Sequence, residues 1–219
     1  NRISTGRTDA ILDVCELDDW RSSIERDAVS VWQWLVYFND VTGLRFLQGK
    51  YGSLGNMNLD EELGNAAFFG HWQMCRFLID AGANTAAAHH ETGETALHSA
   101  VSKAGRPYYI HVVKMLLESG APANAQTIPG QETGACMRDV RTKGETALHR
   151  AAAYADAETI ALLIEHGADV SVKDAHGDSP LSYASFHLRP GSVLKLLEHG
   201  DYKIHPRSTK TLTSDHGHG

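Results

Sequence analysis

The chain has 219 residues, and 20 lysines and arginines against 27 aspartates and glutamates give it a formal net charge of −7. Because no run of basic residues could displace counterions from phosphates, we do not expect the chain to bind nucleic acid. No window approaches the roughly 18 consecutive apolar residues of a bilayer-spanning helix, so we also expect no membrane insertion.

The three cysteines, Cys15, Cys75 and Cys136, lack the paired spacing of metal ligands and cannot all pair with one another. We therefore expect no disulfide framework, and a reducing compartment such as the cytoplasm is favoured. The sequence begins at Asn1 rather than at methionine, which suggests a processed or trimmed product, so a signal peptide would already be gone and the compartment stays open.

The N-terminal part divides into a polar extension and a helical unit. Residues 1–19 lack a sustained period, whereas apolar side chains recur at helical spacing from Trp20 to Phe38 and predict a long first helix. A short apolar group before Gly49 predicts a shortened second helix. We therefore expect residues 20–58 to form one atypical helical unit.

A motif recurs along the rest of the chain. Its clearest copy is Thr146-Ala147-Leu148-His149-Arg150-Ala151-Ala152, and Gly167 follows 21 positions after Thr146. Related copies begin at Thr95 and at Ser179, and Ser179 lies 33 positions after Thr146 and 21 before Gly200. Self-similarity at a fixed period indicates a tandem array rather than one globular core.

This motif and its period resemble those of the ankyrin repeat family. The resemblance implies an all-α solenoid of stacked antiparallel helix pairs with finger loops, in which the unit 20–58 caps the N-terminal end. A degenerate copy is anchored by Gly82. The expected repeats are 59–90, 91–126, 143–174 and 175–205, and a polar, mobile tail is expected at 206–219.

Local residue choices agree with this architecture. Thr95, Thr146 and Ser179 are expected to cap the first helix of a repeat through their side-chain oxygens. The glycines that follow the second helices are expected to adopt the left-handed conformation typical of helix C-caps. These glycines are Gly82, Gly120, Gly167 and Gly200.

Two repeats depart from the standard spacing. Thr95 and Gly120 are 25 rather than 21 positions apart, which places four extra residues around Lys103 to Tyr109, between two helices. Gly120 and Thr146 are 26 positions apart, against 12 for Gly167 and Ser179. The fourteen extra residues fall within 126–143, where turn residues predict an enlarged, exposed finger loop.

The 13 histidines raise the question of a metal or catalytic site. The resemblance implies that His98 and His149 form structural hydrogen bonds between neighbouring loops. His89-His90-Glu91 lacks the spacing of a helical zinc motif, and the tail Asp215-His216-Gly217-His218 could hold only adventitious metal. Cys136 lies near Arg138 and Arg141, which could lower its thiol pKa, although an incidental loop cysteine is the simpler interpretation. Cys75 is expected in the core.

No nucleophile elbow, phosphate loop or dinucleotide fingerprint is present, so we predict no enzyme activity, no cofactor and no metal. The resemblance instead implies a concave groove formed by the ends of the first helices and by the fingers. Aromatic residues at these positions would anchor a partner, unless Phe68 turns inward to fill the degenerate repeat. The predicted partner-binding residues are Phe68, Phe69, Lys103, Arg138, Arg141, Lys143, Tyr154, His176, Phe186 and His187.

Further contacts are expected at the finger tips, namely Glu91, Glu94, Thr142, Glu145, Ala175 and Asp178. We therefore predict a monomeric protein-binding module, a scaffold or an inhibitor, that recognises a partner through its groove and enlarged finger. An alternative is the targeting domain of a larger enzyme or bacterial effector. A third hypothesis is activity within the array at Cys136 or at His89-His90.

Overall fold

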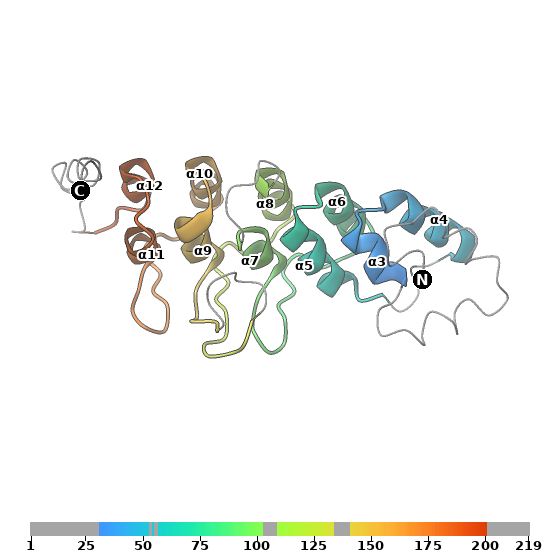
Figure 1. Cartoon of the computed structure of the whole chain (residues 1–219), viewed down its shortest axis with the longest axis horizontal. Coiled ribbons are helices and arrows are strands. Elements are labelled where there is room, and N and C mark those ends of the chain that lie inside the picture. The colour runs from blue at the N-terminus through green and yellow to red at the C-terminus, as the bar shows by residue number, and fades with distance from the viewer. Residues whose placement is uncertain (1–30, 53, 55–56, 103–108, 134–140, 201–219) are drawn as a thin grey trace, which may run out of the picture.

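The computed structural model describes residues 31–52, 54, 57–102, 109–133 and 141–200. They form an elongated stack of helix pairs, arranged in two rows (Figure 1). The first row is α3 (Val31–Tyr37), α5 (Leu59–Phe69), α7 (Ala96–Ala100), α9 (Ala147–Tyr154) and α11 (Pro180–Phe186). The second row is α4 (Val41–Tyr51), α6 (Trp72–Asp80), α8 (Tyr109–Glu118), α10 (Ala157–Glu165) and α12 (Gly191–Leu196).

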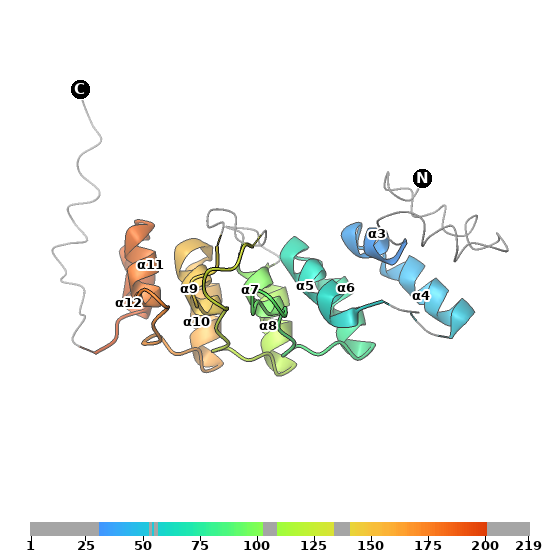
Figure 2. The same ribbon diagram turned by 90° about the horizontal axis from the view of Figure 1, so that it is seen from below.

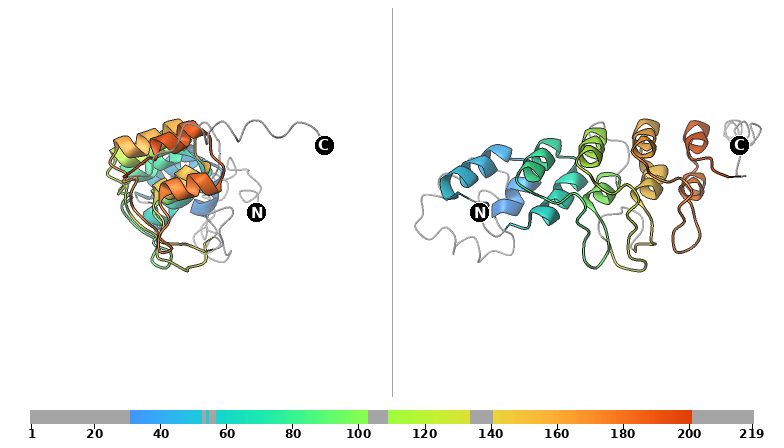
Figure 3. Two further views of the ribbon diagram at one scale, coloured as in Figure 1. Left: turned by 90° about the vertical axis from the view of Figure 1, so that its left-hand side faces the viewer. Right: turned by 180° about the vertical axis from the view of Figure 1, so that it is seen from behind.

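This arrangement confirms the predicted all-α solenoid. The successive pairs lie side by side along the stack (Figure 2). Long loops extend to one side of the first row, and the end-on view shows them folded together along one edge (Figure 3). Within the described ranges no strand forms, and extended backbone is limited to isolated bridges at the fingers, such as Ala88 with Thr95 and Gln126 with Thr146. The fingers and the first row therefore define one continuous face.

The predicted helix caps are present as capping boxes, in which the side chain of Thr95, Thr146 or Ser179 accepts from the backbone of the third helical residue and that residue's side chain accepts in return. Thr95 and Thr146 precede α7 and α9, and their backbone N–H groups donate to Nδ1 of His98 and His149 at 3.2 and 3.1 Å. Ser179 and Ser182 exchange the equivalent pair of hydrogen bonds before α11. These contacts satisfy donors that the first turn of a helix cannot pair internally.

The glycines behind the second helices are left-handed, as predicted. Their φ angles are +105° at Gly82, +88° at Gly120, +87° at Gly167 and +57° at Gly200. The core runs through the whole stack and contains one buried leucine from the first helix of each standard repeat, Leu97, Leu148 and Leu181. Burying such a side chain contributes about 1.5–3 kcal/mol. Each repeat is therefore fixed mainly by its neighbours.

The N-terminal unit differs in part from the prediction. The predicted first helix begins outside the described residues, and the part within them, α3, ends at Tyr37. The second helix was expected to be short, but this is wrong, because α4 spans 11 residues and passes through Gly49. Asp40 caps it by accepting from Gly43 N at 2.9 Å, and a Cβ on Gly43 would come within 2.9 Å of Leu35. Gly43 therefore permits close packing, and Gly49 does not end the helix, which continues to Tyr51.

Two aromatic residues of α3 cover the end of the core. Trp32 and Trp34 are partly buried and pack against the apolar cluster, while Leu35 is fully buried. Cys75 is also fully buried, and burial raises the pKa of its thiol to about 12. Its predicted place in the core is confirmed, and at neutral pH this thiol is protonated and unreactive.

Candidate functional site

A hollow with a volume of about 860 Å³ lies on the finger side. We call it the acidic groove. Its walls are α5 on one side and the finger 87–94 on the other, with residues around the start of α7 and the base of the 126–143 loop completing it. The residues used below are Asp60, Glu61, Phe68, Phe69, His89, Glu91, Glu94, Glu132 and Thr133.

The groove carries an excess of negative charge. Five carboxylates line it, and none of its lining residues is a lysine or an arginine. Glu94 and Glu132 are paired with arginines from outside the lining. Among the residues that the structure describes, Asp60, Glu61 and Glu91 form no ion pair with a lysine or an arginine. Their charge is therefore available to an incoming ligand.

Phe68 and Phe69 stand at the C-terminal end of α5 and are both half-buried. Their rings meet edge to face at 5.4 Å, and Phe69 also contacts the Tyr37 ring at 5.0 Å. The Tyr109 hydroxyl donates to Phe68 O at 2.6 Å, which fixes the end of the helix. The two phenylalanines thus support the neighbouring unit and also present part of their rings to the groove.

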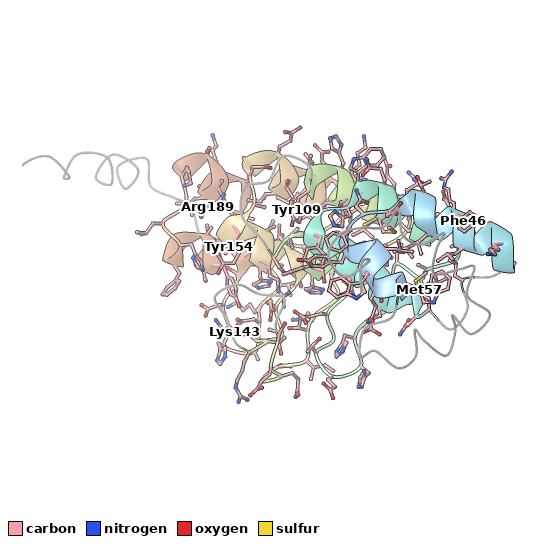
Figure 4. All side chains as sticks on the ribbon, turned by 45° about the vertical axis from the view of Figure 1, so that its right-hand side comes forward. Phe46, Met57, Tyr109, Lys143, Tyr154 and Arg189 are labelled. Atoms are coloured by element: carbon pink, nitrogen blue, oxygen red, sulfur yellow. The ribbon has the colours of Figure 1, made fainter. Side chains whose placement is uncertain are left out.

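A second, smaller hollow of about 10 Å³ lies between α9 and α11. We call it the cationic niche, because Arg141, Lys143 and Arg150 line it together with one carboxylate, that of Glu145, and with Tyr154 and His187. Figure 4 shows Lys143 on the finger and Tyr154 on the first row. The Lys143 Nζ atom lies 5.8 Å from the Tyr183 ring centroid, and Tyr154 and His187 meet edge to face at 5.0 Å.

The structure thus brings four predicted residues together in the niche, Arg141, Lys143, Tyr154 and His187. Two others are solvent-exposed nearby in the last repeat. Phe186 is 84% exposed, and its ring contacts the His187 ring at 5.4 Å. His176 is also exposed and lies on the finger that precedes α11. The remaining predicted residues, Lys103 and Arg138, lie outside the described residues, as does Cys136.

Beneath the two hollows lies a buried ion cluster that sequence reasoning missed. Arg150 is 2% exposed, and its Nη2 lies 2.7 Å from Glu94 Oε1 and 2.5 Å from Glu145 Oε1. Its Nη1 donates to Ser102 Oγ at 3.1 Å. Threonine hydroxyls complete the carboxylate shells, with Thr133 donating to Glu94 and Thr127 to Glu145. One arginine therefore links the second repeat, the third repeat and the loop between them.

Three predicted finger-tip contacts are wrong. Glu94, Glu145 and Thr142 were expected to be finger-tip contacts, but Glu145 and Thr142 are buried and the Glu94 side chain is 11% exposed. For the two glutamates the physical reason is Arg150, whose charge requires counter-charges inside the repeat junction. Thr142 is buried because its hydroxyl closes the base of the loop, donating to Ile128 O and accepting from Gln131 N. A signal was present in the sequence, since an arginine occurs in the stretch Ala147 to Ala153, whose other residues are alanines, one leucine and the structural His149.

The cluster also sets the protonation states. Burial tends to raise the pKa of Glu145, but the charge of Arg150 and the hydrogen bonds from Thr127 and Lys143 N lower it to about 2. Burial and the charge of Arg150 lower the pKa of His98 to about 4. His98 is therefore neutral at pH 7, accepts at Nδ1 and donates from Nε2 to Glu145 O at 3.2 Å.

His149 repeats this pattern at the next junction, where its Nε2 bonds to Asp178 O at 3.1 Å and burial lowers its pKa. The predicted structural role of both histidines is confirmed. Each joins the start of one repeat to the finger of the next, and neither faces a hollow as a general base.

The 126–143 loop has an ordered base. Thr127 N donates to Glu145 O, and Gly130 N and Thr142 O form a further backbone bond at 2.7 Å. The Thr133 hydroxyl lies 2.8 and 2.9 Å from the two oxygens of Glu94. Residues 128–132 are exposed, as predicted, but the ends at Thr127 and Thr142 are buried. The loop is thus an exposed finger anchored in the ion cluster, and residues 134–140 lie outside the description.

The histidines and carboxylates of the described residues do not gather into a set of metal ligands. In the described part of the chain, no group of three or more histidine, cysteine or carboxylate side chains could hold a metal ion. The rings of His89 and His90 lie 4.8 Å apart, tilted by 36°, and both line the groove. The tail motif at 215–218 lies outside this part. None of the described helices is long and apolar enough to cross a membrane.

Comparison with known proteins gives a consistent result. Residues 34–127 and 128–207 match the family described as ankyrin repeats (3 copies). The chain is 31% identical over 121 residues to human Rabankyrin-5, covering 55% of this chain and 10% of that protein. It is 34% identical over 125 residues to the Drosophila melanogaster ankyrin repeat and KH domain-containing protein mask, covering 57% of this chain and 3% of that protein.

A third relative is the E3 ubiquitin-protein ligase KEG of Arabidopsis thaliana, which is 25% identical over 132 residues, covering 60% of this chain and 7% of that protein. The chain therefore spans a tenth or less of the length of these relatives. What they share with it is the repeat array.

Proposed function

We propose that this chain, which belongs to the ankyrin repeat family, holds an extended segment of a partner protein along the acidic groove and the cationic niche. Ankyrin repeats are protein-binding modules and are typically non-catalytic. The observation that carries the proposal is the groove of about 860 Å³, enclosed by α5, a finger and the base of the enlarged loop. A hollow of this size accommodates several side chains of a ligand.

The surroundings of the two hollows suit a protein ligand. Phe68 and Phe69 in the groove, Tyr154 in the niche and the exposed Phe186 give aromatic surface, which anchors interfaces at low conformational cost. Charged residues surround these rings and supply specificity more than affinity. Rigid walls favour binding, because less conformational entropy is lost when the partner docks.

The enlarged loop contributes a fixed wall in this proposal. Thr133 and Glu132 reach the groove from the loop, and Glu132 pairs with Arg141 of the niche at 3.2 Å. The loop therefore separates the two hollows and would touch the partner over both. Whether the bound protein makes this chain a scaffold or an inhibitor depends on the partner.

Site-specific photo-crosslinking tests the proposal. A photo-reactive phenylalanine analogue is placed at His89 in the groove or at Phe186 beside the niche, and as controls at Arg76 of α6 or Lys114 of α8, all of them exposed. In native lysate we expect one partner to be captured from both test positions and from neither control. Capture that is as strong from the control positions as from the test positions, or that occurs from the controls alone, would overturn the concave site.

A second candidate function is that of a targeting module in a larger enzyme or bacterial effector. The observation in its favour is that the relatives are much longer than the matched segment. The length of the complete reading frame tests it. A frame little longer than 219 residues leaves no room for a catalytic domain and excludes this candidate.

A further inference from the structure

The acidic groove has two chemically different ends, which lie at the two ends of α5. Asp60 and Glu61 lie in the first turn of this helix, whereas Phe68 and Phe69 lie in its last turn. All four residues line the same hollow. At 1.5 Å per residue, the helix from Glu61 to Phe69 spans about 12 Å. A ligand that follows α5 therefore meets charge at one end and ring surface at the other.

At the charged end, carboxylates stand on both walls. Asp60 and Glu61 belong to α5, and Glu91 lies on the facing finger. Asp60 accepts from Asn84 N at 2.7 Å, and Glu91 lies 3.7 Å from the His90 ring, so these contacts position the side chains without a lysine or an arginine. A guanidinium or an ammonium that enters between the walls would meet a carboxylate on each of them.

The groups around this end compensate its negative charge only in part. The N-terminus of α5 is equivalent to about half a positive elementary charge, which is less than the charge of the two carboxylates in its first turn. Glu132 is matched by Arg141. Below the groove, however, Glu94 and Glu145 share the single guanidinium of Arg150, so this cluster keeps an excess of negative charge. The potential at this end of the groove therefore favours a cation.

Small residues leave space between the two walls. Gly64 of α5 and Ala96 and Ser99 of α7 line the groove where these helices approach one another. A Cβ on Gly64 would lie 4.0 Å from Ser99 Oγ, so little side-chain volume fills this strip. A lysine or arginine can lay its apolar stem along such a surface while its charged end reaches the carboxylates.

At the other end, the rings of Phe68 and Phe69 are held in place. They meet edge to face at 5.4 Å, and the Tyr109 hydroxyl donates to Phe68 O at 2.6 Å. Both rings are half-buried and contribute surface to the groove. A fixed aromatic surface binds an apolar side chain with little loss of conformational entropy.

We propose that the partner segment carries a lysine or arginine for the charged end of the groove and an apolar side chain for the ring end. An extended chain rises about 3.3 Å per residue, so the 12 Å between the two ends corresponds to a spacing of about four residues. This inference rests on the proposed function and specifies its ligand. An aspartate or glutamate at the first position would be repelled from both walls, and such like-charge contacts suppress wrong partners.

A displayed library of random peptides of about a dozen residues, long enough to pass both ends of the groove, tests the inference. The full chain is compared with a groove variant, Asp60→Asn, Glu61→Gln and Glu91→Gln. These changes remove charge but keep the hydrogen-bonding shape, including the acceptor for Asn84 N. The matched control is Asp80→Asn, Glu158→Gln and Glu165→Gln, which removes the same charge from exposed positions on the second helix row. Urea unfolding checks that both variants are folded.

We expect the full chain and the control to enrich peptides with a basic and an apolar residue at a constant spacing of about four positions. Replacing the basic residue of such a peptide by glutamine should weaken its binding to these two proteins about tenfold. The same replacement should have little effect on binding to the groove variant, because the carboxylates that it would meet are already neutral. Replacing the apolar residue by serine should weaken binding to all three proteins.

Two groups of results would overturn the inference, and they differ in what they leave standing. Enriched peptides that cross-link to a photo-reactive residue at His89 but lack the basic or the apolar residue would remove the proposed ligand and keep the concave site. A glutamine replacement that weakens binding equally in the groove variant and the control would do the same. No peptide retained by any version, or cross-links from Arg76 and Lys114 alone, would remove the proposed function as well.

Discussion

The junctions on either side of the third repeat begin with the same sequence and are held together differently. Both the second and the third repeat contain Gly-Glu-Thr-Ala-Leu-His, at 93–98 and 144–149. In each, the histidine bonds to the finger of the following repeat. The next residue differs, Ser99 in one repeat and Arg150 in the other. Arg150 reaches back to Glu94 and Glu145, so the junction between the second and third repeats is ionic.

The junction between the third and fourth repeats uses neutral contacts around one buried carboxylate instead. Tyr183 meets the His149 ring edge to face at 5.0 Å and donates to Asp174 at 2.9 Å. Arg189 of the last repeat donates to backbone oxygens of Ala153 and Ala155. The comparison shows that the ionic junction occurs where the enlarged loop needs an anchor, since Thr133 bonds to Glu94 of the same cluster.

The largest expected effect is loss of Arg150. In Arg150→Met the carboxylates of Glu94 and Glu145 stay buried without their counter-charge, which should lower the free energy of unfolding by about 3–5 kcal/mol. Urea unfolding at pH 7 measures this. The triple variant Glu94→Gln, Glu145→Gln, Arg150→Met should be clearly more stable than Arg150→Met alone. A loss below about 1 kcal/mol for the single variant would contradict the ionic junction.

Stability should fall as the pH drops below about 6.5. The folded pKa of His98 is lowered to about 4, so the unfolded chain binds the proton first and is favoured between these two values. The loss is about 1.4 kcal/mol per pH unit, or roughly 2 kcal/mol from pH 6.5 to pH 5. His149, whose pKa is also lowered, adds a loss of the same sign. Urea unfolding at several pH values measures it.

The carboxylate of Glu145 acts in a lower pH window. Its folded pKa is about 2 against an ordinary value of 4.5, so its contribution is present above 4.5 and is lost between 4.5 and 2. A profile that is flat from pH 7 to pH 5 and then falls would assign acid unfolding to the carboxylates, and the neutral role of His98 would be wrong.

A smaller effect is expected at the neutral junction. Tyr183→Phe removes the hydrogen bond to Asp174 but keeps the ring against His149, so the free energy of unfolding should fall by about 0.5–1.5 kcal/mol. The same urea experiment measures it beside Arg150→Met. If Tyr183→Phe lowered the free energy of unfolding as much as Arg150→Met does, the proposed difference between the two junctions would be wrong.

The sequence predicted those features that depend on local chemistry repeated at a fixed spacing. The caps at Thr95 and Thr146, the left-handed Gly120 and Gly167, and the inter-loop bonds of His98 belong to this class. Each is determined by residues within a few positions or by the next copy of the same motif. The length of α4 was not predicted, because the apolar pattern stops before Gly49 and the helix was therefore expected to end there.

Part of the candidate site could be predicted because the family resemblance places the concave face. Phe68, Phe69, Tyr154 and His187 do line the two hollows. The sequence could not show that Glu94 and Glu145 turn inward, because this depends on Arg150, which is distant from Glu94 in the chain and close in space.

The smallest expected effect on stability is at Phe186, which belongs to the last repeat but takes no part in its junction. The side chain is 84% exposed, so Phe186→Ser should change the free energy of unfolding by less than about 0.5 kcal/mol. An exposed phenylalanine beside the niche is nevertheless a natural anchor, and its loss should weaken binding of the captured partner about tenfold. Leu188→Ser, at another strongly exposed apolar residue, is the control. Equal weakening by both variants would point to a nonspecific apolar contact at the end of the array. A selective effect of Phe186→Ser would show that the bound partner extends to the last repeat.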